Sequence, residues 1–108
     1  IADNACGHLW VLGPEVRADW RAMDLAAHGV LGVVRGTLER EGCGRNVLGD
    51  PRIALTWIAN ELSHVGETLA AGQVVTTGTC MVPLDVAPGD TVDADFGPFG
   101  RMSLRFAI

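Results

Sequence analysis

The clearest alternation of apolar and polar residues lies near the end of the chain, in residues 91–96 and again in residues 101–106. A period of two places the apolar side chains on one face of a β-strand. Both apolar sets share that face only if Phe96 lies opposite Met102, which requires a loop with an odd number of residues. We therefore expect a hairpin here, with Gly100 as a left-handed bulge residue.

Shorter apolar stretches predict further strands. Residues 9–12 form one apolar run. Residues 25–34 are apolar with interspersed glycines, and they lead into Arg35-Gly36, which suits a two-residue hairpin turn because glycine accepts a positive φ. The return strand would be residues 37–41. The β-branched stretch 73–77 predicts one more strand.

One stretch in the middle of the chain has the spacing of a helix. Asp50 can cap it and Pro51 suits its first position. Apolar residues recur at helical spacing from 53 to 65, and Gly66 stands where a left-handed residue ends a helix. We expect an amphipathic helix that lies on a sheet. The predicted fold class is therefore mixed α+β, mainly β, with one long helix packed on the sheet.

The composition agrees with a single folded domain over residues 1–108. Apolar residues make up 48% of the chain and charged residues 19%, which excludes a disordered chain. The apolar runs are too short to cross a bilayer. The net charge of −5 and the scattered arginines argue against a nucleic-acid partner. Because the first residue is Ile1 and not methionine, we expect the chain to be cut from something longer.

The cysteines are few and widely separated. Cys6, Cys43 and Cys80 form no Cys-x-x-Cys pair. An odd and sparse set of cysteines is not a disulfide framework, and this spacing offers no local metal chelate. We therefore expect reduced thiols in a cytoplasmic protein.

Two polar segments are candidates for binding a small molecule. Residues 3–8 bring together a carboxylate, an amide, a thiol and an imidazole, although an Asx turn before a strand with Cys6 as a core residue is the simpler explanation. Residues 76–80 carry hydroxyls and backbone N–H groups beside Gly78, which suit the carboxylate of a small acid. A β-bulge explains the second segment equally well.

The histidines lack the spacing of a metal site. His8, His28 and His64 lie in different predicted elements, so structural or solvent-facing roles are expected for each of them. His64 also lies near the end of the predicted helix, where a partial positive charge is favourable.

The carboxylates of the last hairpin allow two interpretations. Asp93 and Asp95 share a strand face and could chelate a hard cation such as Mg²⁺. In the expected register, however, Arg101 and Arg105 face them, and Asp93 lies opposite Arg105. This arrangement favours exposed ion pairs over a metal site.

Several segments, in order along the chain, resemble the 2-keto-4-pentenoate hydratase and 4-oxalocrotonate decarboxylase family. The resemblance covers nearly the whole chain. Each short motif is weak evidence alone, but four motifs in the same order are specific to the family. The segments are Ile1-Ala2-Asp3-Asn4-Ala5 with 9–13, then 47–62, 69–79 and 86–100.

The resemblance implies a fumarylacetoacetate-hydrolase-like β-sandwich or roll built around a divalent metal, usually Mg²⁺ or Mn²⁺. Its members act on 2-hydroxy-2,4-dienoates or their 2-oxo tautomers, which arise from meta-cleavage of aromatic compounds. Hydratases add water, and decarboxylases remove CO₂ from 4-oxalocrotonate. In both reactions the metal chelates the 2-oxo acid and stabilises an enolate.

The resemblance also implies that most of the catalytic machinery lies outside this chain. The three metal-binding carboxylates of the family, and a lysine near the substrate, precede the segment that residues 1–5 match, and this chain has no lysine. It would then be the C-terminal portion of a catalytic domain. We expect the isolated chain to be inactive and to contain no metal ligands.

Five residues carry over as candidate site residues. By resemblance, Asp3 and Asn4 would be catalytic residues that orient substrate or water, and Cys6, Gly78 and Thr79 would bind substrate. The serines found after the alanine in many relatives are replaced here by Cys6-Gly7, which weakens any hydroxyl role at that point.

Three functions remain open at this stage. The resemblance favours a hydratase (a carbon–oxygen lyase) acting on a small 2-oxo or 2-hydroxydienoate acid, and a 4-oxalocrotonate decarboxylase-like enzyme is the alternative. A non-catalytic truncated module that binds a partner chain or a small oxo acid is the third. Open sheet edges would be covered in a homo-oligomer or by a missing N-terminal portion.

Overall fold

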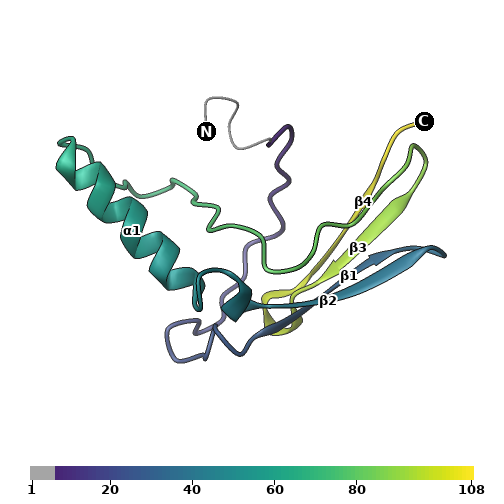
Figure 1. The fold of residues 1–108 in the computed structure, drawn as a ribbon, viewed down its shortest axis with the longest axis horizontal. Helices are drawn as coiled ribbons and strands as arrows, with labels where there is room; N and C mark the ends of the chain where they lie inside the picture. Colours follow the sequence, from purple (N-terminus) through teal and green to yellow (C-terminus); the bar gives the residue numbers. More distant parts are fainter. Residues whose placement is uncertain (1–6) are drawn as a thin grey trace.

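The structure is a computed structural model that describes residues 7–108. It contains a four-stranded antiparallel sheet and one α-helix, an α+β arrangement as predicted, but most of the described chain lies outside regular helices and strands (Figure 1). The elements are β1 (Gly29–Val34), β2 (Leu38–Cys43), α1 (Pro51–His64), β3 (Thr91–Asp95) and β4 (Arg101–Arg105). Among these residues, no helix is long and apolar enough to cross a membrane.

The sheet has the strand order β2-β1-β3-β4, so its two hairpins meet at the central pair β1 and β3. Gly32 lies opposite Ala94 in that pair, and Val34 lies opposite Val92. Val30 and Val34 are buried, which places the small core on one face of β1. Val92 and Leu104 lie on this same face, whereas the apolar residues at positions 31 and 33 of β1 lie on the opposite face, beside the carboxylates of β3.

The first hairpin differs from the prediction by one residue in its loop. Val34 lies opposite Leu38, so the loop holds Arg35, Gly36 and Thr37, and the return strand begins at Leu38. Gly36 has the expected positive φ, +74°. The two-residue turn was wrong because the backbone closes with a hydrogen bond from the Thr37 N–H to the Val34 carbonyl, which keeps Thr37 in the loop.

The second hairpin has the expected loop parity but a register shifted by two residues. Ala94 lies opposite Met102 and Asp95 opposite Arg101, so the predicted pairing of Phe96 with Met102 is wrong. The cause is the loop, in which a 3₁₀ turn at Gly97–Phe99 takes Phe96 out of the strand. Gly100 has a positive φ of +95°, as expected. Because the shift is even, the apolar side chains keep their common face.

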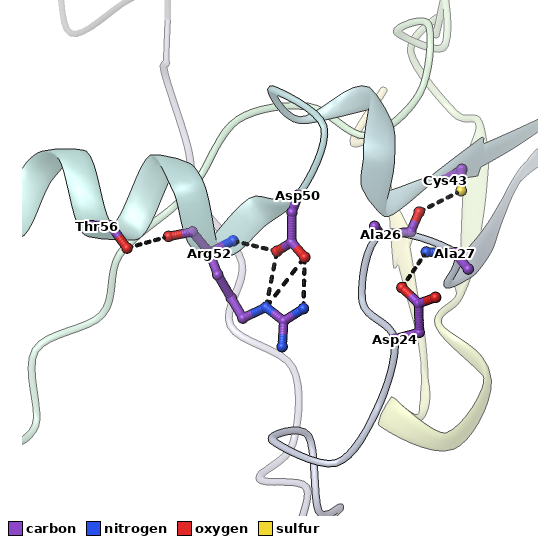
Figure 2. Close-up of polar contacts among 7 residues, drawn as sticks. All are labelled: Asp24, Ala26, Ala27, Cys43, Asp50, Arg52 and Thr56. Carbon is purple, nitrogen blue, oxygen red and sulfur yellow. Dashed lines mark hydrogen bonds and ion pairs between the residues drawn. The ribbon is translucent and has the colours of Figure 1, made fainter.

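Helix α1 begins and ends where the sequence predicts. Asp50 caps it by accepting a hydrogen bond from the Arg52 N–H at 2.8 Å, and Pro51 occupies its first position (Figure 2). At the other end Gly66 has φ +77°. The Glu67 N–H donates to the Leu62 carbonyl and the Gly66 N–H to the Ser63 carbonyl, which is the Schellman pattern.

The prediction that this helix lies on the sheet is wrong. Helix α1 extends away from the sheet (Figure 1), and none of its residues is buried. Ile53 and Trp57 on its apolar side are 53% and 60% exposed. The sequence pattern predicts the helix itself correctly. However, no other helix or strand among residues 7–108 covers its apolar side.

The two predicted strands at residues 9–12 and 73–77 are absent, and both segments are irregular. A β-branched or apolar sequence becomes a strand only when a neighbouring strand takes up its backbone hydrogen bonds. Neither segment meets such a partner among the described residues. Leu9 and Val74 accordingly remain exposed, at 85% and 55%.

The segment that follows residue 79 crosses the core face of the sheet and depends on two glycines. A Cβ at Gly32 would lie 2.9 Å from the Leu84 side chain and 3.0 Å from the Met81 sulfur. A Cβ at Gly42 would lie 2.6 Å from the Cys80 carbonyl oxygen. The backbone of Cys80 can therefore approach β2 only because position 42 has no side chain.

We expect Gly42→Ala to destabilise the fold, by about 1–3 kcal/mol, because its new methyl group meets backbone and not a flexible side chain. Gly29→Ala in the same sheet is the matched control, since its Cβ would meet nothing closer than 4.0 Å. It should cost about 0.5 kcal/mol or less. Chemical unfolding followed by circular dichroism measures both free energies, and equal losses would contradict the close approach.

Candidate functional site

The structure brings the two polar segments of the sequence to one place. Gly7, His8, Leu9 and Trp10 line a hollow of about 340 Å³ together with Thr76. Gly7 and His8 end the first segment, and Thr76 begins the second one. Two stretches almost seventy residues apart in sequence therefore border the same space.

Of the five predicted site residues, three lie outside the described part of the chain. These are Asp3, Asn4 and Cys6. Gly78 and Thr79 are described, and neither lines the hollow itself. They follow Thr76 along the chain, between the hollow and the sheet.

The local conformation at Gly78 and Thr79 favours backbone contacts over hydroxyl contacts. Gly78 has φ +112°, a value that side-chain-bearing residues rarely adopt. The Thr79 hydroxyl donates to the Met81 carbonyl at 2.8 Å, so its only proton is already used. In this conformation, the groups at this point that can donate to an anion are backbone N–H groups.

The next residue, Cys80, is held through its carbonyl oxygen. The Cys43 N–H donates to this oxygen at 3.0 Å, and the Asn46 side-chain amide donates to it at 2.8 Å. Two donors match the two lone pairs of a carbonyl oxygen. The contact of Asn46 could not be predicted, because an asparagine after Gly44-Arg45 gives no signal of a partner 34 residues away.

The residues around Asn46 are fixed in turn. Asn46 ends a 3₁₀ turn, Gly44–Asn46, that follows β2 directly. The Gly44 N–H donates to the His28 carbonyl and the Arg45 N–H to the Ala26 carbonyl. The Cys43 thiol also donates to the Ala26 carbonyl at 3.0 Å (Figure 2). The turn that follows β2 is therefore hydrogen-bonded to the segment that directly precedes β1.

The histidines have the structural or exposed positions that their spacing indicates. His28 Nε2 is 2.8 Å from the Phe96 carbonyl oxygen, and its ring meets the Phe99 ring edge-on at 5.0 Å. His64 lies 3.7 Å from Glu61 at the end of α1. His8 is exposed and lines the hollow described above.

The carboxylates of β3 form ion pairs, as the sequence favours: Asp95 pairs with Arg101, one of the two arginines expected to face them, but Asp93 pairs with Arg35 and not with Arg105. Asp93 binds the Arg35 guanidinium through two hydrogen bonds of 2.6 and 2.8 Å and also accepts from the Ser103 hydroxyl. Asp95 pairs with Arg101 at 2.9 Å. The predicted pair of Asp93 with Arg105 is wrong because the register shift places Ser103 opposite Asp93.

These contacts set the acidity of Asp93. The hydrogen bonds from Arg35 and then from Ser103 lower its pKa from 3.8 to about 2. Both carboxylates of β3 are therefore neutralised by neighbouring guanidinium groups. Among residues 7–108, no group of three His, Cys, Asp or Glu side chains could hold a metal ion.

The two described cysteines are free thiols. Cys43 and Cys80 are both half-buried, and their backbones are joined by the hydrogen bond described above. Burial raises the pKa of the Cys80 thiol. A protonated thiol is a poor nucleophile, so Cys80 contributes its carbonyl and not its sulfur to this region.

Arg35→Met should raise the pKa of Asp93 from about 2 towards its ordinary value of 3.8. Because folding lowers this pKa, the pair stabilises the fold above pH 3.8, and that stability is lost as the pH falls towards 2. NMR titration of the Asp93 carboxyl carbon measures the shift. Arg45→Met removes an arginine that does not contact Asp93 and should leave the midpoint in place. An unchanged midpoint in Arg35→Met would disprove the assignment.

Comparison with known proteins gives relatives over almost the whole chain, although no family model matches it. The 4-oxalocrotonate decarboxylase of Pseudomonas putida is 33% identical over 98% of this chain. The 2-keto-4-pentenoate hydratase 1 of Dechloromonas aromatica is 36% identical over 99% of it. In both cases the chain spans about 40% of the relative's length.

A solved structure agrees with these relatives. The 4-oxalocrotonate decarboxylase from Pseudomonas putida G7, described as complexed with calcium and acetate, superposes with a TM-score of 0.71 and 33% identity. The match covers 81% of this chain and 34% of that one. Over the portion of those proteins that it spans, this chain is therefore a relative of the 2-keto-4-pentenoate hydratase and 4-oxalocrotonate decarboxylase family, which confirms the resemblance seen in its sequence.

Proposed function

We propose that this chain is part of an enzyme that adds water to a 2-hydroxypenta-2,4-dienoate or its 2-oxo tautomer in the breakdown of aromatic compounds. The observation that carries the proposal is the relationship to hydratases and decarboxylases over nearly all of its residues. The hollow between residues 7–10 and Thr76 supports it, because the two candidate binding segments border the same space.

In this proposal, five residues form walls of the substrate site. Asp3 and Asn4 orient substrate or water, and Cys6 contributes to substrate binding. The backbone N–H groups of Gly78 and Thr79 hold the substrate carboxylate. The Thr79 hydroxyl is left to accept a hydrogen bond, because it donates its own proton to the Met81 carbonyl. This refines the role that the sequence gives to Thr79.

The metal part of the proposal lies outside this chain. The described residues do not form a metal centre. The related decarboxylase from Pseudomonas putida G7 is complexed with calcium, which supports a divalent cation in the complete enzyme. We propose Mg²⁺ or Mn²⁺, held by residues that this chain does not contain.

We further propose that residues 1–108 belong to the C-terminal portion of a fumarylacetoacetate-hydrolase-like domain that acts in the cytoplasm. The exposure of apolar side chains on α1 and in residues 9–12 supports a larger assembly. In that assembly the remaining portion, or further copies in a homo-oligomer, would cover these surfaces.

A 4-oxalocrotonate decarboxylase is the second candidate, and it is favoured by the similarity to the solved decarboxylase structure. A non-catalytic module is the third. The product distinguishes the first two, because a hydratase yields a 4-hydroxy-2-oxo acid and a decarboxylase releases CO₂. A module binds the acid or a partner and releases neither product.

The test uses the protein translated from the whole open reading frame that encodes these residues, beside the 108-residue chain. We expect the longer protein to consume 2-hydroxypenta-2,4-dienoate when Mg²⁺ or Mn²⁺ is present, and to lose this activity with EDTA. The 108-residue chain should be inactive. Absorbance of the dienoate and chromatography of the product provide the measurement.

Each outcome decides between the candidates. Release of CO₂ from 4-oxalocrotonate without hydration favours the decarboxylase, and binding without turnover favours the module. Metal-dependent turnover by the 108-residue chain alone would overturn the proposal that the metal ligands lie elsewhere.

A further inference from the structure

The end of β2 and the connection that follows it contact residues 78–80 at three points. Gly42 allows the Cys80 carbonyl to approach, and Asn46 donates a hydrogen bond to that carbonyl at 2.8 Å. Val47, which is only 6% exposed, lies beside Gly78, where a Cβ would be 3.6 Å from the valine methyl group. The contacts thus include residues on both sides of Thr79.

Among these contacts, the hydrogen bond from Asn46 is the one that a side chain donates. Position 42 is occupied by glycine, and the Cys43 contact is made by its backbone. Asn46 itself is exposed and belongs to a turn whose backbone is fixed by Ala26 and His28. Its removal therefore changes how Cys80 is held without disturbing the core.

The two hydrogen bonds to the Cys80 carbonyl hold the peptide group between Cys80 and Met81, which directly follows the residues that carry the Gly78 and Thr79 N–H groups. A chain that enters at Gly78 with φ +112° has few conformations that also satisfy both donors at the Cys80 oxygen. The loss of one donor leaves a single hydrogen bond to define the direction of the segment. The N–H groups of Gly78 and Thr79 would then sample a wider range of directions.

We propose that Asn46 is a positioning residue: its amide holds the Cys80 carbonyl so that the backbone N–H groups of Gly78 and Thr79 face the carboxylate of a small 2-oxo acid. This inference rests on the proposed function for the substrate, but the anchoring of the segment is independent of it. Asn46 acts through the segment and does not touch the substrate.

The test compares Asn46→Ala and the isosteric Asn46→Asp with Asn60→Ala, which removes an exposed asparagine on α1. In the protein translated from the whole open reading frame, both Asn46 variants should raise KM for the dienoate about tenfold, with kcat within about twofold. Asn60→Ala should change neither constant. A fall in kcat with unchanged KM, or no change at all, would overturn the inference.

A second measurement does not depend on turnover. In the substrate-free protein, ¹⁵N relaxation of the Gly78 and Thr79 amides should show lower order in both Asn46 variants than in the wild type and Asn60→Ala. Unchanged order would overturn the positioning role. If the wild type does not turn over the dienoate but the amides still lose order, the proposed function fails and the anchoring of the segment stands.

Discussion

The contact between the Cys80 backbone and β2 is the constraint on which the arrangement of the candidate site depends. It exists because position 42 has no side chain, so the Cys80 carbonyl can reach two donors on the connection that follows β2. The absence of a side chain at position 42 permits the close approach, and the hydrogen bonds act at the same point. The sheet therefore positions a segment that has no regular structure of its own.

Most local features of the fold could be predicted from the sequence. The ends of α1 follow from Asp50, Pro51 and Gly66, because a cap, a fixed φ and a left-handed residue act within one turn of the chain. The parity of the β3–β4 loop followed from alternation. The register of this hairpin could not be predicted from alternation, because two registers that differ by two residues bury the same face. The 3₁₀ turn in the loop selects one of them.

The long-range features could not be predicted in the same way. Nothing in residues 51–65 indicates whether another element covers the helix, and nothing in residues 73–77 supplies a strand partner. The family resemblance assigned neighbouring residues of the two polar segments to one site, but nothing in the sequence indicated that residues 7–10 and Thr76 line a common hollow. The role of Asn46 has no sequence signal at all, since it depends on a single amide that meets a distant carbonyl.

The strand order has a consequence for how the chain folds. Each hairpin closes through a short loop, but the β1–β3 pairing that unites them brings together residues such as Arg35 and Asp93, 58 positions apart. The entropy of closing so long a loop must be lost before the pairing stabilises anything. The β1–β3 pairing therefore carries a larger loop-closure cost than either hairpin, each of which closes through a loop of a few residues.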